Sequence, residues 1–252
     1  MTMGTCSTQA YGEAWYWDNR YAHESSPFDW YQKFPSLAPL IHLYIPHRHH
    51  PVLVVGCGNS AFSQDMLDDG YEDVVSIDIS SVVIQTMRNK YSNRPQLQYM
   101  TMDVRDMSAF QTGSFNAVFD KGTLDSLLCG NDSRQNAVKM LEEVWSILFL
   151  LSFKNEMYVS QPLVEPGFQC NCFFSGSVGS FRSLELLDIE EKLVTEESSE
   201  HPKWKLTDPV PLDDDGSNVE AVLGKNPDVH YVYICTKDES LKAGPKHEVV
   251  VE

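Results

Sequence analysis

The sequence predicts an α/β fold with a mostly parallel sheet that helices cover on both faces. From Val52 onward, short apolar runs alternate with stretches of helical period, a pattern typical of such a sheet. The first run passes through Gly56-Cys57-Gly58 into a helix-like stretch. Asp78 follows the second run, 22 residues after Gly56, and a spacing of about 20 is typical of Rossmann-like folds. These observations define the Rossmann-like class.

The expected elements follow one another along the chain. Gly70 ends the first helix, and Ser80 caps the second, because its side chain can accept a hydrogen bond from a free N–H of the first turn. The long third helix is predicted from apolar residues that recur at helical spacing. Strands are expected at 52–55, 74–77, 97–100, 115–119, 157–160 and 229–236, and helices at 60–67, 80–90 and 138–148.

The charge of the chain narrows the class of partner. Among 252 residues there are 19 Lys and Arg against 36 Asp and Glu, a formal net charge of −17. Phosphate contacts require basic surface, so the balance argues against binding of nucleic acid and of anionic membranes. It fits a basic protein partner, although the same charge could simply keep the protein in solution.

The cysteines and histidines indicate the cellular compartment and whether a metal site is expected. The six cysteines form no C-x-x-C pair, which indicates free thiols in a reducing compartment. We see neither a signal peptide nor an apolar run of roughly 20 residues, and we expect a cytoplasmic protein, with a nuclear location open. His47, His49 and His50 lack a neighbouring carboxylate or cysteine, so we interpret them as a solvated turn and expect no metal.

The glycine turn leaves two cofactor classes open. Glycine allows positive φ and close approach of a ligand, and Asp78 is placed to accept from ribose hydroxyls. These features serve a nicotinamide dinucleotide or S-adenosylmethionine, and an ordinary turn with a solvent-facing Asp78 is the alternative. Asp103 favours S-adenosylmethionine, because it could accept from the adenine amine while the Val104 N–H reaches the ring. The alternative for Asp103 is a turn or helix cap.

Six sequence blocks occur together in this chain, and the combination of "GCGNS" with "DKGTLD" is much more selective than either piece. They are "YWDNRY", "PFDWY", "VLVVGCGNS", "DISSVVI", "QYMTMDVRDM" and "FNAVFDKGTLDSLL". In combination they resemble the small class I S-adenosylmethionine-dependent methyltransferases of the elongation factor 1-alpha lysine methyltransferase group. The resemblance covers about 11–147 and resumes near "HPKWKLTDPVPL" and "DVHYVYICTKD". It implies a seven-strand sheet with an antiparallel C-terminal strand, S-adenosylmethionine as cofactor, and a lysine-presenting protein substrate.

The resemblance also implies roles for particular residues. Independently of it, Trp17 and Tyr21 are four residues apart and share one helix face, where aromatic rings could attract a sulfonium cation; packing in the core is the alternative. Asp120 and Asp125 are candidates to assist deprotonation of a lysine amine, with helix capping as the alternative, and no catalytic residue is assigned. The implied cofactor-binding residues are Trp17, Tyr21, Trp30, Gly56, Asp78, Ile79, Asp103, Val104 and Lys121.

The chain is expected to hold a single methyltransferase domain over 11–236, between a disordered stretch at 1–10 and a polar tail at 237–252. Within the domain, 11–50 is predicted to be an aromatic lid. The segment 149–185 has no clean period, and the resemblance lapses there. The function is therefore open between an active protein lysine methyltransferase and a cofactor-binding homologue that is weak or inactive. A NAD-type oxidoreductase is a third reading.

Overall fold

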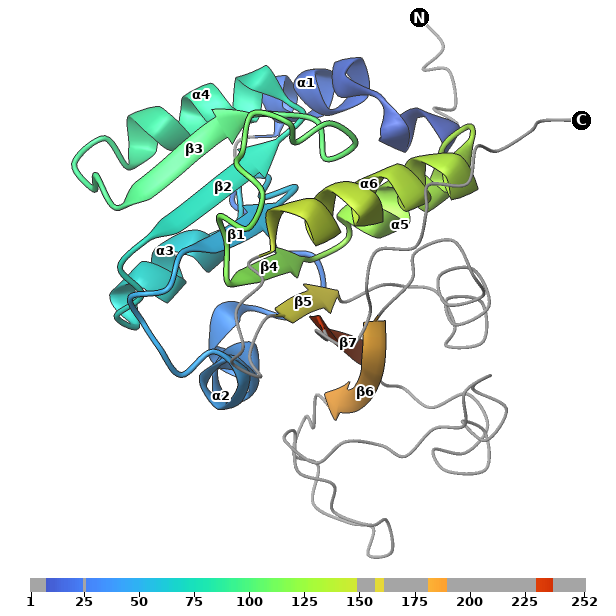
Figure 1. Cartoon of the computed structure of the whole chain (residues 1–252). Coiled ribbons are helices and arrows are strands. Elements are labelled where there is room, and N and C mark those ends of the chain that lie inside the picture. The colour runs from blue at the N-terminus through green and yellow to red at the C-terminus, as the bar shows by residue number, and fades with distance from the viewer. Residues whose placement is uncertain (1–7, 25, 149–156, 161–180, 190–229, 238–252) are drawn as a thin grey trace, which may run out of the picture.

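The computed structural model describes residues 8–24, 26–148, 157–160, 181–189 and 230–237. Figure 1 shows a central twisted sheet with helices packed on both of its faces. The arrangement is the α/β, Rossmann-like fold that the alternation of strands and helices predicts. No helix among these residues is long and apolar enough to cross a membrane.

Four parallel strands carry the site. They are β1 (Val52–Val55), β2 (Val74–Asp78), β3 (Leu97–Thr101) and β4 (Ala117–Asp120), in the order β3-β2-β1-β4. Val52 of β1 lies opposite Val74 on one side and Ala117 on the other. The order reverses after β1, because β2 and β3 lie on one side of it and β4 on the other. In open sheets of this kind, a ligand crevice forms at the carboxyl ends of the strands where the order reverses.

Three further strand segments are paired beyond β4. β5 (Met157–Ser160) runs parallel to β4. β7 (His230–Lys237) pairs antiparallel with β5 and with β6 (Phe181–Ile189). The first five residues of β6 lie in the 149–185 segment, in which the sequence predicts a strand only at 157–160. Most of that segment lies outside the described residues.

Side chains of each central strand alternate between two apolar clusters, as the period of a strand requires. Val52 and Val54 pack with the first cluster, and Leu53 and Val55 with the second. The helices of the first cluster are α2 (Phe34–Tyr44), α3 (Phe62–Asp68) and α4 (Ser81–Lys90), and those of the second are α5 (Thr123–Cys129) and α6 (Ser133–Ile147). A strand buried on both faces reads as a continuous apolar run, as "VLVV" does.

The N-terminal region divides into a cover and a core helix. The helices η1 (Thr8–Gly12) and α1 (Ala14–His23), with the loop at 26–32, lie over the carboxyl edge of the sheet. In contrast, α2 has Phe34, Leu37, Leu40 and Ile41 buried in the first cluster, so this part of the predicted 11–50 lid packs into the core. The helix η1 also begins inside the stretch predicted to be disordered, and Ala10 is buried.

Some helix boundaries differ from the sequence predictions. The Ser80 side chain accepts a hydrogen bond from Val83 N at 3.3 Å, which confirms the predicted cap. The long helix α6 begins at Ser133 rather than 138. The short helix α5 was not among the predicted helices.

Candidate functional site

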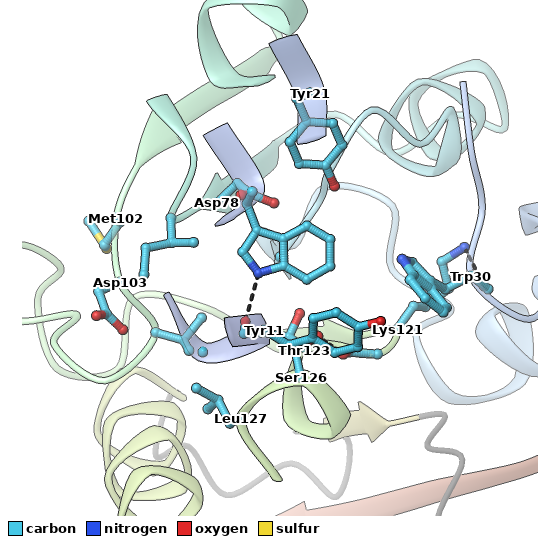
Figure 2. Close-up of a pocket in the computed structure, with 16 residues that line it drawn as sticks. Tyr11, Tyr21, Trp30, Asp78, Met102, Asp103, Lys121, Thr123, Ser126 and Leu127 are labelled. Atoms are coloured by element: carbon cyan, nitrogen blue, oxygen red, sulfur yellow. Dashed lines mark hydrogen bonds between the residues drawn. The ribbon is translucent and has the colours of Figure 1, made fainter. Parts of the chain in front are cut away.

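A pocket opens at the carboxyl edge of the sheet, beneath η1, α1 and the 26–32 loop. Its empty space is about 560 Å³, which includes the part that is open to solvent. Figure 2 shows Met102 and Asp103 at one end and Trp30 and Lys121 at the other. The lining residues are Tyr11, Gly12, Trp17, Tyr21, Trp30, Gly56, Asp78, Ile79, Met102, Asp103, Val104, Lys121, Gly122, Thr123, Ser126 and Leu127.

All nine residues for which the sequence predicts cofactor contacts line this one pocket. Sequence reasoning missed seven others, among them four residues from Gly122 to Leu127. The block "DKGTLDSLL" carried a signal for these four, since it directly follows a strand end. Tyr11, Gly12 and Met102 had no such signal.

The two glycines of the turn have positive φ, +57° at Gly56 and +51° at Gly58. A Cβ on Gly56 would lie 1.8 Å from Thr123 Oγ1, and one on Gly58 would lie 2.6 Å from the Tyr21 hydroxyl. Thr123 Oγ1 donates to the Val55 carbonyl at 3.1 Å. The expectation that the turn glycines leave space for a ligand is therefore incomplete: in this structure they make room for side chains of α5 and α1.

Asp78 ends β2 and is buried. Its Oδ2 accepts from Gly58 N at 2.9 Å and its Oδ1 accepts from Ser80 N at 2.9 Å. Burial raises the pKa of this carboxyl to about 6, and the N–H donors oppose the rise. Ser80 Oγ also donates to Asp18 Oδ1 at 2.7 Å, which ties α1 to the start of α4. Asp78 therefore faces the pocket rather than bulk solvent.

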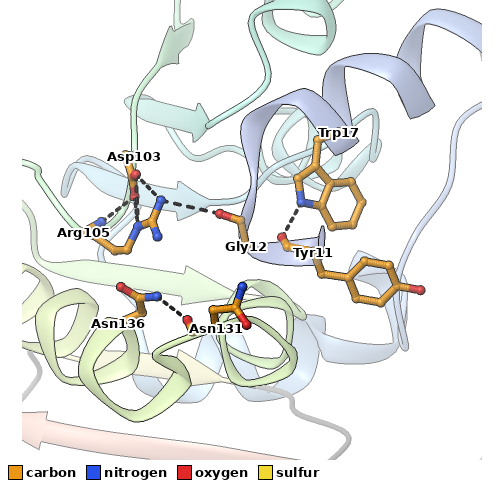
Figure 3. A network of polar contacts seen from close by, with 7 residues as sticks. All are labelled: Tyr11, Gly12, Trp17, Asp103, Arg105, Asn131 and Asn136. Carbon is orange, nitrogen blue, oxygen red and sulfur yellow. Dashed lines mark hydrogen bonds and ion pairs between the residues drawn. The ribbon is translucent and has the colours of Figure 1, made fainter. Parts of the chain in front are cut away.

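Asp103 forms a close ion pair next to the pocket (Figure 3). Arg105 donates to it through Nη2 at 2.6 Å and through its backbone N at 2.9 Å, and the same Nη2 lies 3.5 Å from the Gly12 carbonyl. The backbone bond is the turn cap that was the alternative interpretation of Asp103. The capping contact and the position in the pocket wall occur together, because a carboxylate can accept several hydrogen bonds.

The rings of α1 form one wall of the pocket. Trp17 and Tyr21 are stacked, with centroids 5.9 Å apart, as their spacing predicts. Trp17 Nε1 donates to the Tyr11 carbonyl at 2.7 Å, which fixes η1 against α1 (Figure 3). Burial raises the pKa of the Tyr21 phenol, with Asp78 adding to the effect. Within the described chain, the Tyr21 hydroxyl has no hydrogen-bond partner.

The loop at 26–32 is fastened to the turn after β1. The Phe28 N–H donates to Asn59 Oδ1 at 3.0 Å, and Asn59 Nδ2 donates to the Ser26 carbonyl at 2.7 Å. Ser60 donates to the carboxylate of Asp29. Asn59 and Ser60 of "GCGNS" therefore hold the loop in place.

The same loop is fastened to the end of β4 by Lys121. Its Nζ forms an ion pair with Asp29 at 2.9 Å, donates to the Gln32 carbonyl at 2.8 Å, and lies 4.8 Å from the ring centroid of Phe62. Only 10% of the Lys121 side chain and 11% of the Asp29 side chain are exposed. Burial lowers the pKa of Lys121, while Asp29 opposes this shift. The motifs "GCGNS" and "DKGTLD" meet at this loop, which gives a physical reason why their combination is selective.

The two carboxylates considered for catalysis have different environments. Asp120 accepts from Thr123 N at 2.8 Å and from Leu124 N at 3.3 Å, so it caps α5, which was its alternative interpretation. Asp125 instead accepts from the Tyr31 hydroxyl at 2.6 Å. Both carboxylates are buried.

No group of three or more His, Cys, Asp or Glu among the described residues is placed to hold a metal ion. The rings of His47, His49 and His50 do cluster, with centroids 4.6–5.8 Å apart. Burial, and then its two neighbours, lowers the pKa of His50.

Comparison with known proteins shows which proteins this chain resembles. A protein-family model described as "Methyltransferase domain" matches residues 52–148. The chain is 44% identical over 122 residues to a Bos taurus protein named "EEF1A lysine methyltransferase 4", covering 48% of this chain and 47% of that protein. It is 40% identical over 146 residues to the Bos taurus "eEF1A lysine and N-terminal methyltransferase", covering 56% and 21% respectively.

A solved structure shows the same fold. A protein from Pyrococcus horikoshii OT3 superposes with a TM-score of 0.50 at 16% identity, covering 87% of this chain and 99% of that one. Residues 52–148 thus match a methyltransferase domain in sequence, and the solved structure supports the fold. The chain is similar to the eEF1A lysine methyltransferases named above. It spans about half of the length of one Bos taurus protein and about a fifth of the length of the other.

The pocket fits S-adenosylmethionine by its chemistry. The Asp78 and Asp103 carboxylates can accept from hydroxyl and amine donors, and the Tyr21 hydroxyl is a further polar group aimed at the space over Gly58. The faces of Trp17, Tyr21 and Trp30 suit a cation, because aromatic rings attract positive charge. The residues that would hold the cofactor are thus contributed by α1, the loop and four strand ends.

Proposed function

We propose that the chain is an S-adenosylmethionine-dependent methyltransferase that methylates a lysine side chain of a protein, with elongation factor 1-alpha as the first acceptor to test. The observation that carries the proposal is the convergence of all nine predicted cofactor residues in one pocket at the reversal of strand order. The names of the most similar relatives support lysine methylation.

We assign the two ends of the pocket to the two ends of the cofactor. Asp103 and Val104 are proposed to bind adenine, and Asp78 and Ile79 the ribose. Trp17, Tyr21, Trp30 and Gly56 surround the sulfonium, and Lys121 holds the loop closed at the methionine end. The cofactor supplies an activated methyl group, so the protein mainly has to align the acceptor and exclude water. The buried Lys121–Asp29 pair and the ring wall serve the second task.

The acidic charge of the chain supports a basic protein acceptor. A net charge of −17 attracts basic partners and speeds their encounter, whereas nucleic acid and anionic membranes carry the wrong charge. A cytoplasmic location follows from this proposal, because the proposed acceptor is a cytosolic protein; a nuclear location stays open.

We also infer that β5, β6 and β7 complete a seven-strand sheet with an antiparallel C-terminal strand. The pairing of β7 with β5 and β6 supports it. The proposed domain over 11–236 then includes these strands, while 149–185 is the segment in which the acceptor side departs from the family pattern. A cofactor-binding but weak methyltransferase remains the alternative, because that segment would border the acceptor.

Two measurements test the proposal on one preparation of the full chain. Calorimetry should show binding of S-adenosylmethionine and none of NAD, which separates methyl transfer from hydride chemistry. Incubation with labelled cofactor and elongation factor 1-alpha, followed by peptide mapping, should place label on a lysine. Cofactor binding without label in this acceptor or in any protein of a cell lysate would favour the weak homologue and contradict the proposal.

A further inference from the structure

The side chains of Tyr31 and Asp125 meet beside the end of the pocket that holds Trp30 and Lys121. The Tyr31 hydroxyl donates to Asp125 Oδ2 at 2.6 Å, although 94 residues separate the two in sequence. Asp125 is 7% exposed. Neither residue is among those proposed above to bind the cofactor.

Two rings of the loop lie against the pocket wall at Gly122. A Cβ built on Gly122 would lie 3.5 Å from Tyr31 Cε2 and 3.6 Å from Trp30 Cγ. Gly122 and Trp30 themselves line the pocket, as does Ser126, the neighbour of Asp125. The Tyr31 ring therefore lies directly behind the wall at this end.

The backbone at Tyr31 supports a role beyond packing. Its φ is +59°, a region that residues other than glycine rarely occupy. Such conformations persist only where the surroundings impose them, and they gather at functional sites. Here Lys121 holds the residues on both sides of Trp30 and Tyr31, through the Asp29 carboxylate and the Gln32 carbonyl. The loop thereby presents the Tyr31 hydroxyl to Asp125.

Asp125 differs from the neighbouring carboxylate in the kind of group it binds. Asp120 accepts from two backbone N–H groups at the start of α5. Asp125 accepts from a side-chain hydroxyl on the 26–32 loop. Burial, with Asp125 itself, raises the pKa of Tyr31, so its hydroxyl stays protonated and can both donate and accept.

We propose that Tyr31 and Asp125 together bind the acceptor amine and orient its lone pair toward the methyl group, a role that rests on the proposed lysine methylation. The amine enters after its ammonium form has lost one proton to water. Its lone pair forms the new N–C bond as the S–C bond breaks, and that bond's electron pair stays on sulfur. Positive charge thus moves from sulfur to nitrogen, where the Asp125 carboxylate stabilises it.

The test compares two cofactor analogues in the full chain. Sinefungin carries an amine-bearing carbon where S-adenosylmethionine has its methylsulfonium, and S-adenosylhomocysteine carries no amine there. The amine of sinefungin should reach the pair. We therefore expect Asp125→Asn to weaken sinefungin by about 10-fold or more, since hydrogen bonds to charged groups are the strong ones, while S-adenosylhomocysteine binding changes less than about 2-fold. Tyr31→Phe should weaken sinefungin by about 3–10-fold.

Three matched variants separate this role from closure of the loop. Asn59→Ala removes two hydrogen bonds of the loop without changing the pair, and it should weaken the binding of S-adenosylhomocysteine as well as that of sinefungin. Tyr91→Phe removes a buried hydroxyl at the end of α4 that has no hydrogen-bond partner among the described residues, and Asp132→Asn replaces an acid whose positive φ suits asparagine. Neither of these two variants should change the affinity for either ligand.

Each outcome decides the proposal. A selective loss of sinefungin affinity in Asp125→Asn and Tyr31→Phe supports it. If these two variants lose affinity for both ligands equally, the pair only holds the loop in place and the proposal is overturned. Unchanged affinities for both ligands would also overturn the proposal. If the variants show this selective loss and the wild-type chain nevertheless methylates no protein, the proposed function is overturned while the amine site stays in place.

Discussion

The two ends of the pocket are built in different ways. At the proposed adenosine end, Asp103 is held by Arg105, and Asp78 is held by the N–H groups of Ser80 and, 20 residues away, of Gly58. At the methyl end, Lys121 is paired with Asp29 across 92 residues, and Asp125 with Tyr31 across 94. The first end needs only its own strands and turns, whereas the second requires the 26–32 loop to be in place.

This difference separates two tasks within one pocket. The turns after β1, β2 and β3 together hold Asp78 and Asp103 at the proposed adenosine end. The proposed methyl end additionally contains Trp30 and Tyr31, which come from a segment before β1. On this assignment, the loop that covers the pocket also supplies a group on the acceptor side.

The largest expected effect is at the buried ion pair of the methyl end. Asp29→Ala leaves Lys121 without its buried partner, and breaking such a pair typically costs about 3–5 kcal/mol. We expect a fall of this size in the free energy of unfolding, measured by urea denaturation. As a control, Asp68→Asn breaks the exposed pair with Arg94 and should have little effect. Equal stability of the two variants would show that the loop is not fastened by this pair.

The next effect is a pH dependence that belongs to the adenosine end. The pKa of Asp78 is about 6 in the folded chain against an ordinary value of 3.8, so between these pH values the folded state binds more protons than the unfolded state. The free energy of unfolding should therefore fall as pH rises from about 4 to 7, by about 3 kcal/mol in total. The same titration of Asp78→Asn should lack this fall, and an identical pH profile in the two proteins would contradict the assignment.

A somewhat smaller effect is expected on cofactor affinity. Asp78→Ala removes a charged acceptor from the proposed ribose site and should weaken S-adenosylmethionine by about 1.5–3 kcal/mol in calorimetry, the range of hydrogen bonds to charged groups. The variant also leaves two backbone N–H groups unpaired, so circular dichroism must first show that it is folded. Unchanged affinity in a folded variant would remove Asp78 from the site.

The smallest expected effect concerns the Tyr21 hydroxyl, which tests where the polar end of the pocket stops. Tyr21→Phe deletes a hydroxyl that lies over Gly58 without a described partner, and it should weaken S-adenosylmethionine by about 0.5–1.5 kcal/mol, the net worth of one hydrogen bond. Its free energy of unfolding should stay the same, because no protein hydrogen bond is lost. A fall in stability without a fall in affinity would mean that this hydroxyl serves packing alone.

The sequence predicted the adenosine end better than the methyl end for a physical reason. Strands and buried helix faces follow a local period, and Asp78 and Asp103 follow strand ends, so their meeting at one edge could be inferred. The contacts of Asn59, Lys121 and Asp125 with the loop depend on tertiary packing between distant segments, which no period encodes. Only the resemblance pointed to Lys121, and nothing in the sequence pointed to Tyr31.

The glycine turn shows a second limit. Positive φ could be predicted at Gly56 from its place between a strand and a helix. That its missing Cβ makes room for Thr123 could not, because the short helix α5 was not predicted. The strand β6 was missed in the same way, since its residues show no clean alternation.

The most direct test of this account is a crystal structure of the full chain with sinefungin. We expect adenine beside Asp103 and Val104, the ribose hydroxyls on Asp78, and the amine within hydrogen-bonding distance of the Tyr31–Asp125 pair, with Lys121 still bonded to Asp29. A ligand outside this pocket would contradict the proposed cofactor site. An amine that faces away from Tyr31 and Asp125 would contradict the proposed division of the pocket into an adenosine end and a methyl end.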